Sequence, residues 1–230
     1  MCSSDLKPAW PAPAKSSLLP PREPETLAAY ALDASKSEAA REAAINSHAH
    51  LAGPIMEHLI RDLTPGTPAE YERIPWIWRA AIAAGRRNDA EQLRGILQIA
   101  LPTDNEPLRH WQAVVIGGGL INGVSQLDLW PARRFADVFA ADASLEKRWR
   151  RAIDLAAAMA NDPSVPNGTR YDALRLLGAA AFEKYGSVLT GYLKSGTNEE
   201  LQMGAVSGLA DVESPKAGAA LIAAFRELEP

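Results

Sequence analysis

Apolar residues recur along this chain at steps of three and four residues, with charged and polar residues between them. The spacing is regular in three segments, at Ile74, Ile77, Trp78, Ala81 and Ile82, at Leu93, Ile96, Leu97 and Leu101, and at Leu145, Trp149, Ile153 and Ala156. Such steps follow the helical period and place the apolar side chains on one face of a helix. No stretch alternates as a half-buried strand would. The pattern therefore predicts an all-α protein.

Helix-start signals recur between these segments. A serine, threonine or asparagine followed three residues later by an acid can satisfy backbone amides at a helix start. This pattern begins at Ser35, Thr67, Asn88, Thr169 and Thr197, and Ser214-Pro215 is predicted to open the last helix. Breaks rich in proline and glycine fall at residues 64–66 and 102–104, at Pro131 and at residues 163–168. The chain therefore reads as a series of short helices joined by tight connections.

The C-terminal third of the chain repeats itself. Residues 171–193 and 203–225 align at an offset of about 32 residues, which is typical of helical arrays. The equivalent pairs are Ala173 and Ala205, Leu177 and Leu209, Lys184 and Lys216, Gly186 and Gly218, and Leu189 and Leu221. Each copy has the pattern of a helical hairpin, which can bury its apolar face only by stacking on a neighbour. We therefore predict an α-solenoid over residues 26–230, with diverged upstream units and a longer arm at residues 106–126.

The first 25 residues differ from the rest in composition. Residues 7–25 contain Pro8, Pro11, Pro13, Pro20, Pro21 and Pro24. Proline removes backbone donors and favours extended chain, so we expect a disordered linker, with order beginning near Thr26 and a short helix ending at Leu32. Residues 1–6, which include the single cysteine, Cys2, resemble the translation of a sequencing-adapter end. We expect that this hexapeptide is not part of the natural protein, which then continues upstream.

Charge argues against a nucleic-acid partner. The net charge is −4, whereas nucleic-acid binding requires a basic surface that displaces counterions. Basic residues do gather at Arg133, Arg134, Lys147, Arg148, Arg150 and Arg151. Because Asp137, Asp142 and Glu146 are interleaved with them, a solvated helix face is favoured over a binding patch. No apolar run approaches the ~20 residues that span a bilayer, and residues 7–24 lack the apolar core of a signal peptide.

The glycine run Gly117–Gly119 is the strongest candidate for a cofactor site. It follows Val114-Val115-Ile116 and resembles the first strand and glycine turn of a flavin or nicotinamide enzyme. That fingerprint needs a second strand ending in an acid about 20 residues later, whereas the residues before Asp137 begin a helix. We favour glycines that let two helices approach closely or that mark a kink. A dinucleotide-binding oxidoreductase domain remains the alternative.

Histidines and tryptophans are the other candidates. His48, His50 and His58 could suggest a metal site, but histidines two residues apart point to different sides of a helix, and no cysteine lies among them. We favour a turn in which one histidine caps a helix. His110 stands alone. Trp76, Trp78, Trp111, Trp130 and Trp149 could form an aromatic platform, but most are expected to pack in the core. Trp76 is the exception: it lies off the apolar stripe of its helix and is the tryptophan that we consider a candidate for binding.

Other short motifs carry little chemistry. No G-x-S-x-G nucleophile motif is present, and no serine has a readable histidine and acid beside it. Asn167-Gly168-Thr169 matches a glycosylation acceptor, a pattern that arises often by chance. We therefore assign no catalytic, cofactor-binding or metal-binding residue.

Three stretches carry a family resemblance, at residues 73–79, 111–119 and 202–211. They resemble the HEAT-repeat region of the large multidomain haem-binding proteins of planctomycete-type bacteria, over most of residues 36–228. In that family a β-propeller precedes the helical array and a c-type cytochrome domain follows it. The sequence contains no C-x-x-C-H haem motif. The resemblance therefore implies HEAT-like hairpins that connect domains of a larger exported redox protein, in the periplasm or cell envelope.

Together these observations predict a non-catalytic helical-repeat scaffold or protein-interaction module with no cofactor. Its partner would be another protein or the neighbouring domains of the parent chain. We also expect the array to continue past the last helix. There Ala217, Leu221, Ala224, Phe225 and Leu228 should pack on the preceding unit, while Ala219, Ile222 and Ala223 form a second, apolar face.

Overall fold

The structure is a computed structural model that describes residues 22–194 and 196–227, and all its regular structure there is helical. The α-helices are α1 (Pro24–Leu32), α2 (Glu38–Ser47), α3 (Ala52–Ile60), α4 (Pro68–Arg87), α5 (Ala90–Ala100), α6 (His110–Ala113), α7 (Asn122–Ser125), α8 (Pro131–Phe139), α9 (Ala143–Asn161), α10 (Asn167–Leu177), α11 (Phe182–Gly191), α12 (Glu199–Asp211) and α13 (Pro215–Glu227). A 3₁₀ turn, η1 (Ala49–Leu51), precedes α3, and a π-helix, η2 (Val114–Ile121), joins α6 to α7. The prediction of an all-α protein is confirmed.

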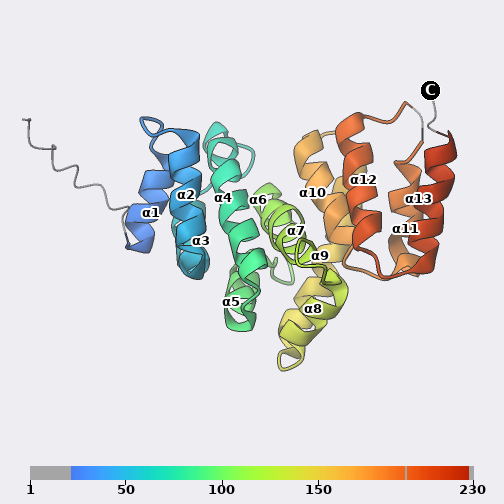
Figure 1. Ribbon diagram of the computed structural model, residues 1–230, viewed down its shortest axis with the longest axis horizontal. Helices are drawn as coiled ribbons and strands as arrows, with labels where there is room; N and C mark the ends of the chain where they lie inside the picture. The colour runs from blue at the N-terminus through green and yellow to red at the C-terminus, as the bar shows by residue number, and fades with distance from the viewer. Residues whose placement is uncertain (1–21, 195, 228–230) are drawn as a thin grey trace, which may run out of the picture.

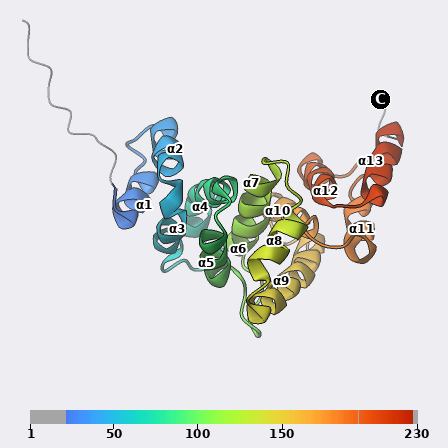
Figure 2. The same cartoon turned by 60° about the horizontal axis from the view of Figure 1, so that its bottom comes forward.

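The helices are laid out in chain order along the molecule. Figure 1 shows them running from α1 at one end to α13 at the other. Figure 2 shows that they follow an open curve, with α9 near its lowest point and α1 and α13 toward its raised ends. One row is formed by α4, the segment from α6 to α7, α10 and α12, each of which packs against the next. The helices α3, α5 and α8 pack in succession beside this row, and α11 packs on α13.

The N-terminal boundary differs slightly from the prediction. Helix α1 begins at Pro24, two residues before Thr26, and it ends at Leu32 as expected. Proline at the first helical position loses no hydrogen bond, so Pro24 starts the helix instead of ending the linker. Leu27 and Ala31 are fully buried and α1 packs on α3. The predicted linker up to residue 21 and the adapter-like hexapeptide with Cys2 lie outside the described residues.

Most helices begin one to three residues from the predicted position. Ser37 caps α2 in place of Ser35, Asp89 caps α5 in place of Asn88, and Asn198 caps α12 in place of Thr197. In each case a polar residue one or two positions away offers the same kind of side-chain acceptor, so the pattern alone does not select between them. Helix α10 begins at Asn167, which places Thr169 inside it, and the Thr67 side chain does not cap α4. Helix α13 begins at Pro215, as predicted.

Gly117–Gly119 lies within the row formed by α4, the segment from α6 to α7, α10 and α12. Residues 110–125 form one uninterrupted helical segment, of which Val114–Ile121 has the i→i+5 hydrogen bonding of a π-helix. A β-carbon on Gly117 or Gly118 would overlap Asp172 of α10, and one on Gly119 would overlap Ala81 of α4. The interpretation that these glycines let helices approach closely is confirmed. The segment is a helix buried between two others, so the strand that a dinucleotide fold requires is not present there.

The two copies of the C-terminal repeat form the pairs α10–α11 and α12–α13. Ala173 and Leu177 of α10 are buried, as are Ala205 and Leu209 at the equivalent positions of α12. The first helices of the two pairs, α10 and α12, are joined by a buried ion pair, in which Arg175 Nη2 lies 2.7 Å from Asp211 Oδ2. Equivalent lysines make equivalent contacts, since Lys184 pairs with Asp154 on α9 and Lys216 pairs with Glu183 on α11. The two copies of the repeat therefore resemble each other in their helices and in these lysine contacts.

The last helix packs less completely than expected. Ala217 is buried and Leu221 and Ala224 are partly buried, but Phe225 is 71% exposed. Phe225 was predicted to pack on the preceding unit, and that prediction is wrong. Ile222 is exposed as expected, and Leu228 lies outside the described residues. On α12, Met203 and Val206 are also exposed. These four side chains form what we call the end face, and no described helix covers it.

Candidate functional site

A groove opens between α4 and α10, which belong to the same row of helices. Its volume is about 390 Å³, and α4, the π-helix, α10 and α12 all contribute side chains. The residues that line it are Tyr71, Ile74, Pro75, Trp78, Arg79, Val114, Pro166, Gly168, Thr169, Tyr171, Asp172 and Glu200. Aromatic walls with a few polar groups are typical of binding sites. We call this the α4–α10 groove.

Trp78 forms one wall of the groove and is held by the π-helix. Its indole N–H donates a hydrogen bond to the Gly118 carbonyl oxygen at 2.9 Å. The side chain is only partly buried, although the apolar spacing of α4 predicted a core position. Trp76, predicted to lie off the stripe, is buried instead. The assignments of these two tryptophans were therefore reversed, because their burial is set by the neighbouring helices and not by the stripe of α4 alone.

Asp172 is the unusual group in the groove. Its residue is 8% exposed, and Oδ1 rests on Gly118, where a β-carbon would overlap it and would lie 3.1 Å from Trp78 Cδ1. The carboxyl and the indole therefore meet over one glycine. Burial raises the pKa of the Asp172 carboxyl well above its usual range, with a smaller lowering effect from Arg175 and a raising effect from Glu200. Perturbed acids in grooves are characteristic of functional sites.

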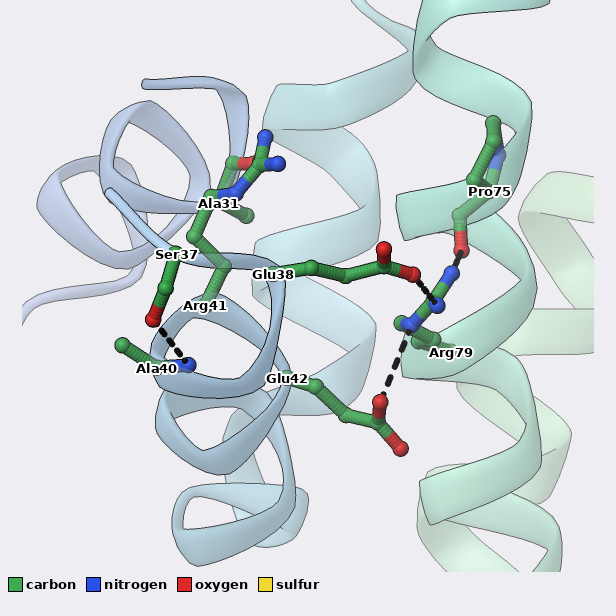
Figure 3. Close-up of polar contacts among 8 residues, drawn as sticks. All are labelled: Ala31, Ser37, Glu38, Ala40, Arg41, Glu42, Pro75 and Arg79. Atoms are coloured by element: carbon green, nitrogen blue, oxygen red, sulfur yellow. Dashed lines mark hydrogen bonds and ion pairs between the residues drawn. The ribbon is translucent and has the colours of Figure 1, made fainter. Parts of the chain in front are cut away.

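A cluster of charged residues flanks the groove where α4 meets α2. Arg79 pairs with Glu38 and Glu42 of α2, and its Nη1 also donates to the Pro75 carbonyl oxygen at 3.2 Å (Figure 3). Two guanidinium groups lie over the buried Trp76 ring, with Arg41 Cζ 4.2 Å and Arg79 Cζ 4.9 Å from the ring centroid. Arg79 is thus held by two carboxylates of α2 and by cation–π contacts with Trp76 and with Trp78, whose ring centroid lies 5.6 Å from Arg79 Cζ.

Glu70 and Gln112 organise the start of the glycine-rich segment. Glu70 is fully buried, and its two carboxylate oxygens accept hydrogen bonds from the backbone amides of Gly66 at 2.6 Å and Trp111 at 3.4 Å. Gln112 Oε1 accepts the Arg109 amide at 2.7 Å. These bonds satisfy donors that a helix start leaves unpaired. They fix where α6 begins relative to α4 and so set the position of the π-helix.

The histidines do not assemble a metal site in the described residues. His48 ends α2 and its Nδ1 lies 2.9 Å from the Ala44 carbonyl oxygen, which confirms the predicted capping role. The His48 and His50 rings are 6.1 Å apart. His110 lies near the groove, with Nδ1 3.3 Å from the Tyr71 hydroxyl. Within residues 22–194 and 196–227, no three His, Cys, Asp or Glu side chains are grouped as metal ligands would be.

The basic cluster makes contacts within the molecule. Arg148 donates to the carbonyl oxygens of Gln98, Leu101 and Pro102, which end helix α5. Arg134 binds Asn88 and Arg151 binds the Thr103 carbonyl oxygen, while Arg133, Lys147 and Arg150 pair with Glu213, Asp104 and Glu146. Apart from Arg150, whose partner Glu146 lies on the same helix, these side chains join α8 and α9 to neighbouring segments. The solvated face that the sequence predicted is found at Arg133, Lys147 and Arg150, which are exposed, whereas Arg134, Arg148 and Arg151 are partly buried.

The remaining candidates are spread over the molecule. Trp111 is buried, and Trp149 packs on Phe135 and Phe139. Trp130 is 42% exposed in the connection before α8. No shared platform of these tryptophans is formed among the described residues. Asn167 of the glycosylation-type motif is the first residue of α10, with Thr169 buried in the same helix.

Sequence inspection missed Asp172, Tyr171 and Glu200. A signal for Asp172 was available, because Thr169, Asp172 and Leu176 are spaced as one buried face of α10, and an acid on such a face is uncommon. Tyr171 and Glu200 carry no comparable signal, since they join the groove only through the packing of α12 on α10.

Comparison with known proteins does not assign the chain to a family. No family model, no curated protein and no solved structure matches it. None of the described helices combines the length and the apolar character needed to cross a membrane.

Proposed function

We propose that this chain is an α-solenoid of HEAT-like hairpins that serves as a non-catalytic scaffold or protein-interaction module. The observation that carries the proposal is the α4–α10 groove, because its walls come from α4, the π-helix, α10 and α12 in turn. Helical-repeat arrays form extended binding surfaces in this way, from side chains of successive units. The repeated contacts of Lys184 and Lys216 support the same architecture.

The chemistry of the groove favours binding over catalysis. Of the described residues that line it, none is a serine, cysteine or histidine, and its buried acid, Asp172, has no base or nucleophile pairing with it. The aromatic side chains Tyr71, Trp78 and Tyr171 offer contact area at low cost in conformational entropy. A protein segment is therefore the partner that we propose. The family resemblance at residues 73–79, 111–119 and 202–211 is the sole support for a place in a larger exported redox protein, with neighbouring domains as partners.

Nucleic acid is not proposed as a partner. The six residues of the basic cluster already contact carboxylates, carbonyl oxygens or an amide of the same chain. A residue so engaged must give up those contacts before it can neutralise a phosphate. The alternative of a dinucleotide-binding domain is not carried further either, since Gly117–Gly119 lies inside a buried helix.

Selection from a random peptide library tests the proposal. The purified chain should enrich peptides whose affinity falls at least about tenfold in Tyr71→Ala, because hot-spot aromatic residues carry most of the energy at interfaces. Trp130→Ala is the matched control, since Tyr71 and Trp130 are 41% and 42% exposed and only Tyr71 lines the groove. Enrichment of no peptide would contradict the interaction module. Peptides that depend on Trp130 instead of Tyr71 would contradict the groove as its binding surface.

A further inference from the structure

The carboxyl of Asp172 lies in the α4–α10 groove without a hydrogen-bond partner among the described residues. Buried carboxylates in folded proteins are nearly always paired or hydrogen-bonded, because their desolvation is otherwise costly. The residue is 8% exposed, and its Oδ1 sits over Gly118 beside the edge of Trp78. Gly118 has no side chain, so nothing from the π-helix covers the carboxyl there. Asp172 is therefore available to a donor that enters the groove.

Arg175 and Arg79, the arginines beside Asp172 on α10 and in the groove wall, already have acidic partners. Arg175, one turn along α10, forms the buried ion pair with Asp211. Arg79, at the other wall, is engaged by Glu38 and Glu42 of α2, as Figure 3 shows. Glu200 adds an exposed carboxylate from α12 and makes no ion pair within the described residues. The unbalanced charge of the groove is therefore negative.

The walls of the groove suit a long side chain with a charged end. Trp78 and Tyr171 are both partly buried and present apolar surface beside the carboxyl. Lysine and arginine lay their methylene stems along such surfaces while the charged head seeks a polar partner. Aromatic faces also attract cations, by about 0.5–1 kcal/mol at exposed sites and more when water is excluded. Charge and shape thus point to the same kind of group.

We propose that the α4–α10 groove binds a lysine or arginine side chain of a partner protein segment, with Asp172 as the acceptor and Trp78 and Tyr171 as the walls. The proposal rests on the proposed function and names the chemistry of the partner. Glu200 at the rim would guide the cation inward, and the ionised form of Asp172 would be restored by the incoming charge.

Titration with defined peptides tests the proposal. The probes are four nine-residue peptides of sequence Ser-Gly-Ser-Leu-X-Leu-Ser-Gly-Ser, in which X is lysine, arginine, glutamine or glutamate. The reporter is the indole N–H signal of Trp78 in nitrogen–proton correlation spectra at low salt. It is identified as the signal that disappears in Trp78→Phe. We expect the lysine and arginine peptides to shift this signal with dissociation constants at least about fivefold lower than that of the glutamine peptide. The glutamate peptide should bind most weakly.

Single substitutions test whether Asp172 produces the preference for the basic peptides. Asp172→Asn should remove the difference between the lysine and glutamine peptides, whereas the same change at Asp137, which is exposed on α8 and outside the groove, should leave it intact. Should Asp172→Asn not fold, Glu200→Gln provides a second variant, which is exposed and should reduce the preference by a smaller factor. Retention of the full preference in the folded variant would overturn the proposal.

The outcomes also separate this inference from the proposed function. If the library yields groove-dependent peptides that lack a basic residue, or if the lysine and glutamine peptides bind equally, the basic-side-chain site is wrong and the interaction module stands. If neither the library nor the defined peptides bind, both are wrong.

Discussion

The helix pairs α10–α11 and α12–α13 share one sequence pattern but differ in how much of it they bury. Leu174 of the first pair is fully buried, whereas Val206 at the equivalent position of the second is 40% exposed. Leu193 is buried and its equivalent, Phe225, is not. The first pair is covered by the second, and no described helix covers the second. An apolar residue in a repeat therefore marks a packing position, and its burial depends on whether a neighbour is present.

Two glycines of the second pair show a related contrast between its helices α12 and α13. Gly208 of α12 lies against the backbone of α10, where a β-carbon would be 2.7 Å from the Leu174 carbonyl oxygen. Gly218 of α13 has no atom within 4 Å of such a β-carbon. Close contact at glycines thus continues from the π-helix through α10 to α12, whereas Gly218 on α13 has open space beside it.

The largest difference is expected between Leu174→Ala and Val206→Ala. Leu174→Ala should lower the free energy of unfolding by about 2–5 kcal/mol, because it leaves a cavity between packed helices. Val206→Ala should change it by less than about 0.5 kcal/mol, since the side chain already meets solvent. Urea denaturation followed by circular dichroism measures both. Similar losses would mean that the end face is covered in solution, for example by self-association, which sedimentation at several concentrations would detect.

Gly208→Ala and Gly218→Ala should have opposite signs. The first forces a methyl group against backbone atoms of α10 and should cost about 1–3 kcal/mol. The second fills open space on a helix and should stabilise the protein by about 0.5–1 kcal/mol, since alanine loses less backbone entropy than glycine. The shift in melting temperature checks both. A neutral Gly208→Ala would show that α10 and α12 can separate at little cost.

Much of the fold follows from the sequence because helical periodicity and repeat spacing are local signals. The stripe of Leu93, Ile96 and Leu97 is buried as predicted, and the offset between the two C-terminal copies places both helix pairs correctly. Helix starts are less certain, since Ser35 and Ser37 offer the same cap and the structure uses Ser37. Local patterns therefore define the elements better than their ends.

The groove could not be predicted in the same way, because its walls come from helices far apart in the sequence. Trp78 and Asp172 meet only over Gly118, and that contact needs the close approach that the glycines permit. The sequence indicated that Gly117–Gly119 would allow close packing but not which helices it would join. Exposure of Phe225 was mispredicted for a related reason, since helical spacing gives the face of a side chain and not the presence of a neighbour.

The smallest effect is expected at the two equivalent lysine contacts, and it depends on pH. Asp154 accepts hydrogen bonds from Lys184 Nζ at 2.7 Å and from the Tyr185 hydroxyl at 2.5 Å, and these hold the pKa of its carboxyl below its usual range. Glu183 accepts one from Lys216 at 2.8 Å, which lowers the pKa of its carboxyl as well. Asp154 thus accepts from two side-chain donors, Lys184 and Tyr185, whereas Glu183 accepts from Lys216 alone among the described side chains.

The sign of the pH dependence follows from the lowered pKa values. An acid whose pKa is lower in the folded state stabilises the protein above its unfolded pKa, which is about 4 for aspartate, and this contribution is lost as the pH falls through the folded pKa. Asp154→Asn should therefore lower the melting temperature at pH 7 and have little effect near pH 2. Glu183→Gln should act in the same direction with a smaller shift, because Glu183 lacks a second donor like Tyr185 and exposed ion pairs contribute little. Melting curves across this pH range measure the two shifts. An Asp154→Asn effect that persists unchanged in acid would assign the stabilisation to packing of Tyr185 and not to the charge of the carboxylate.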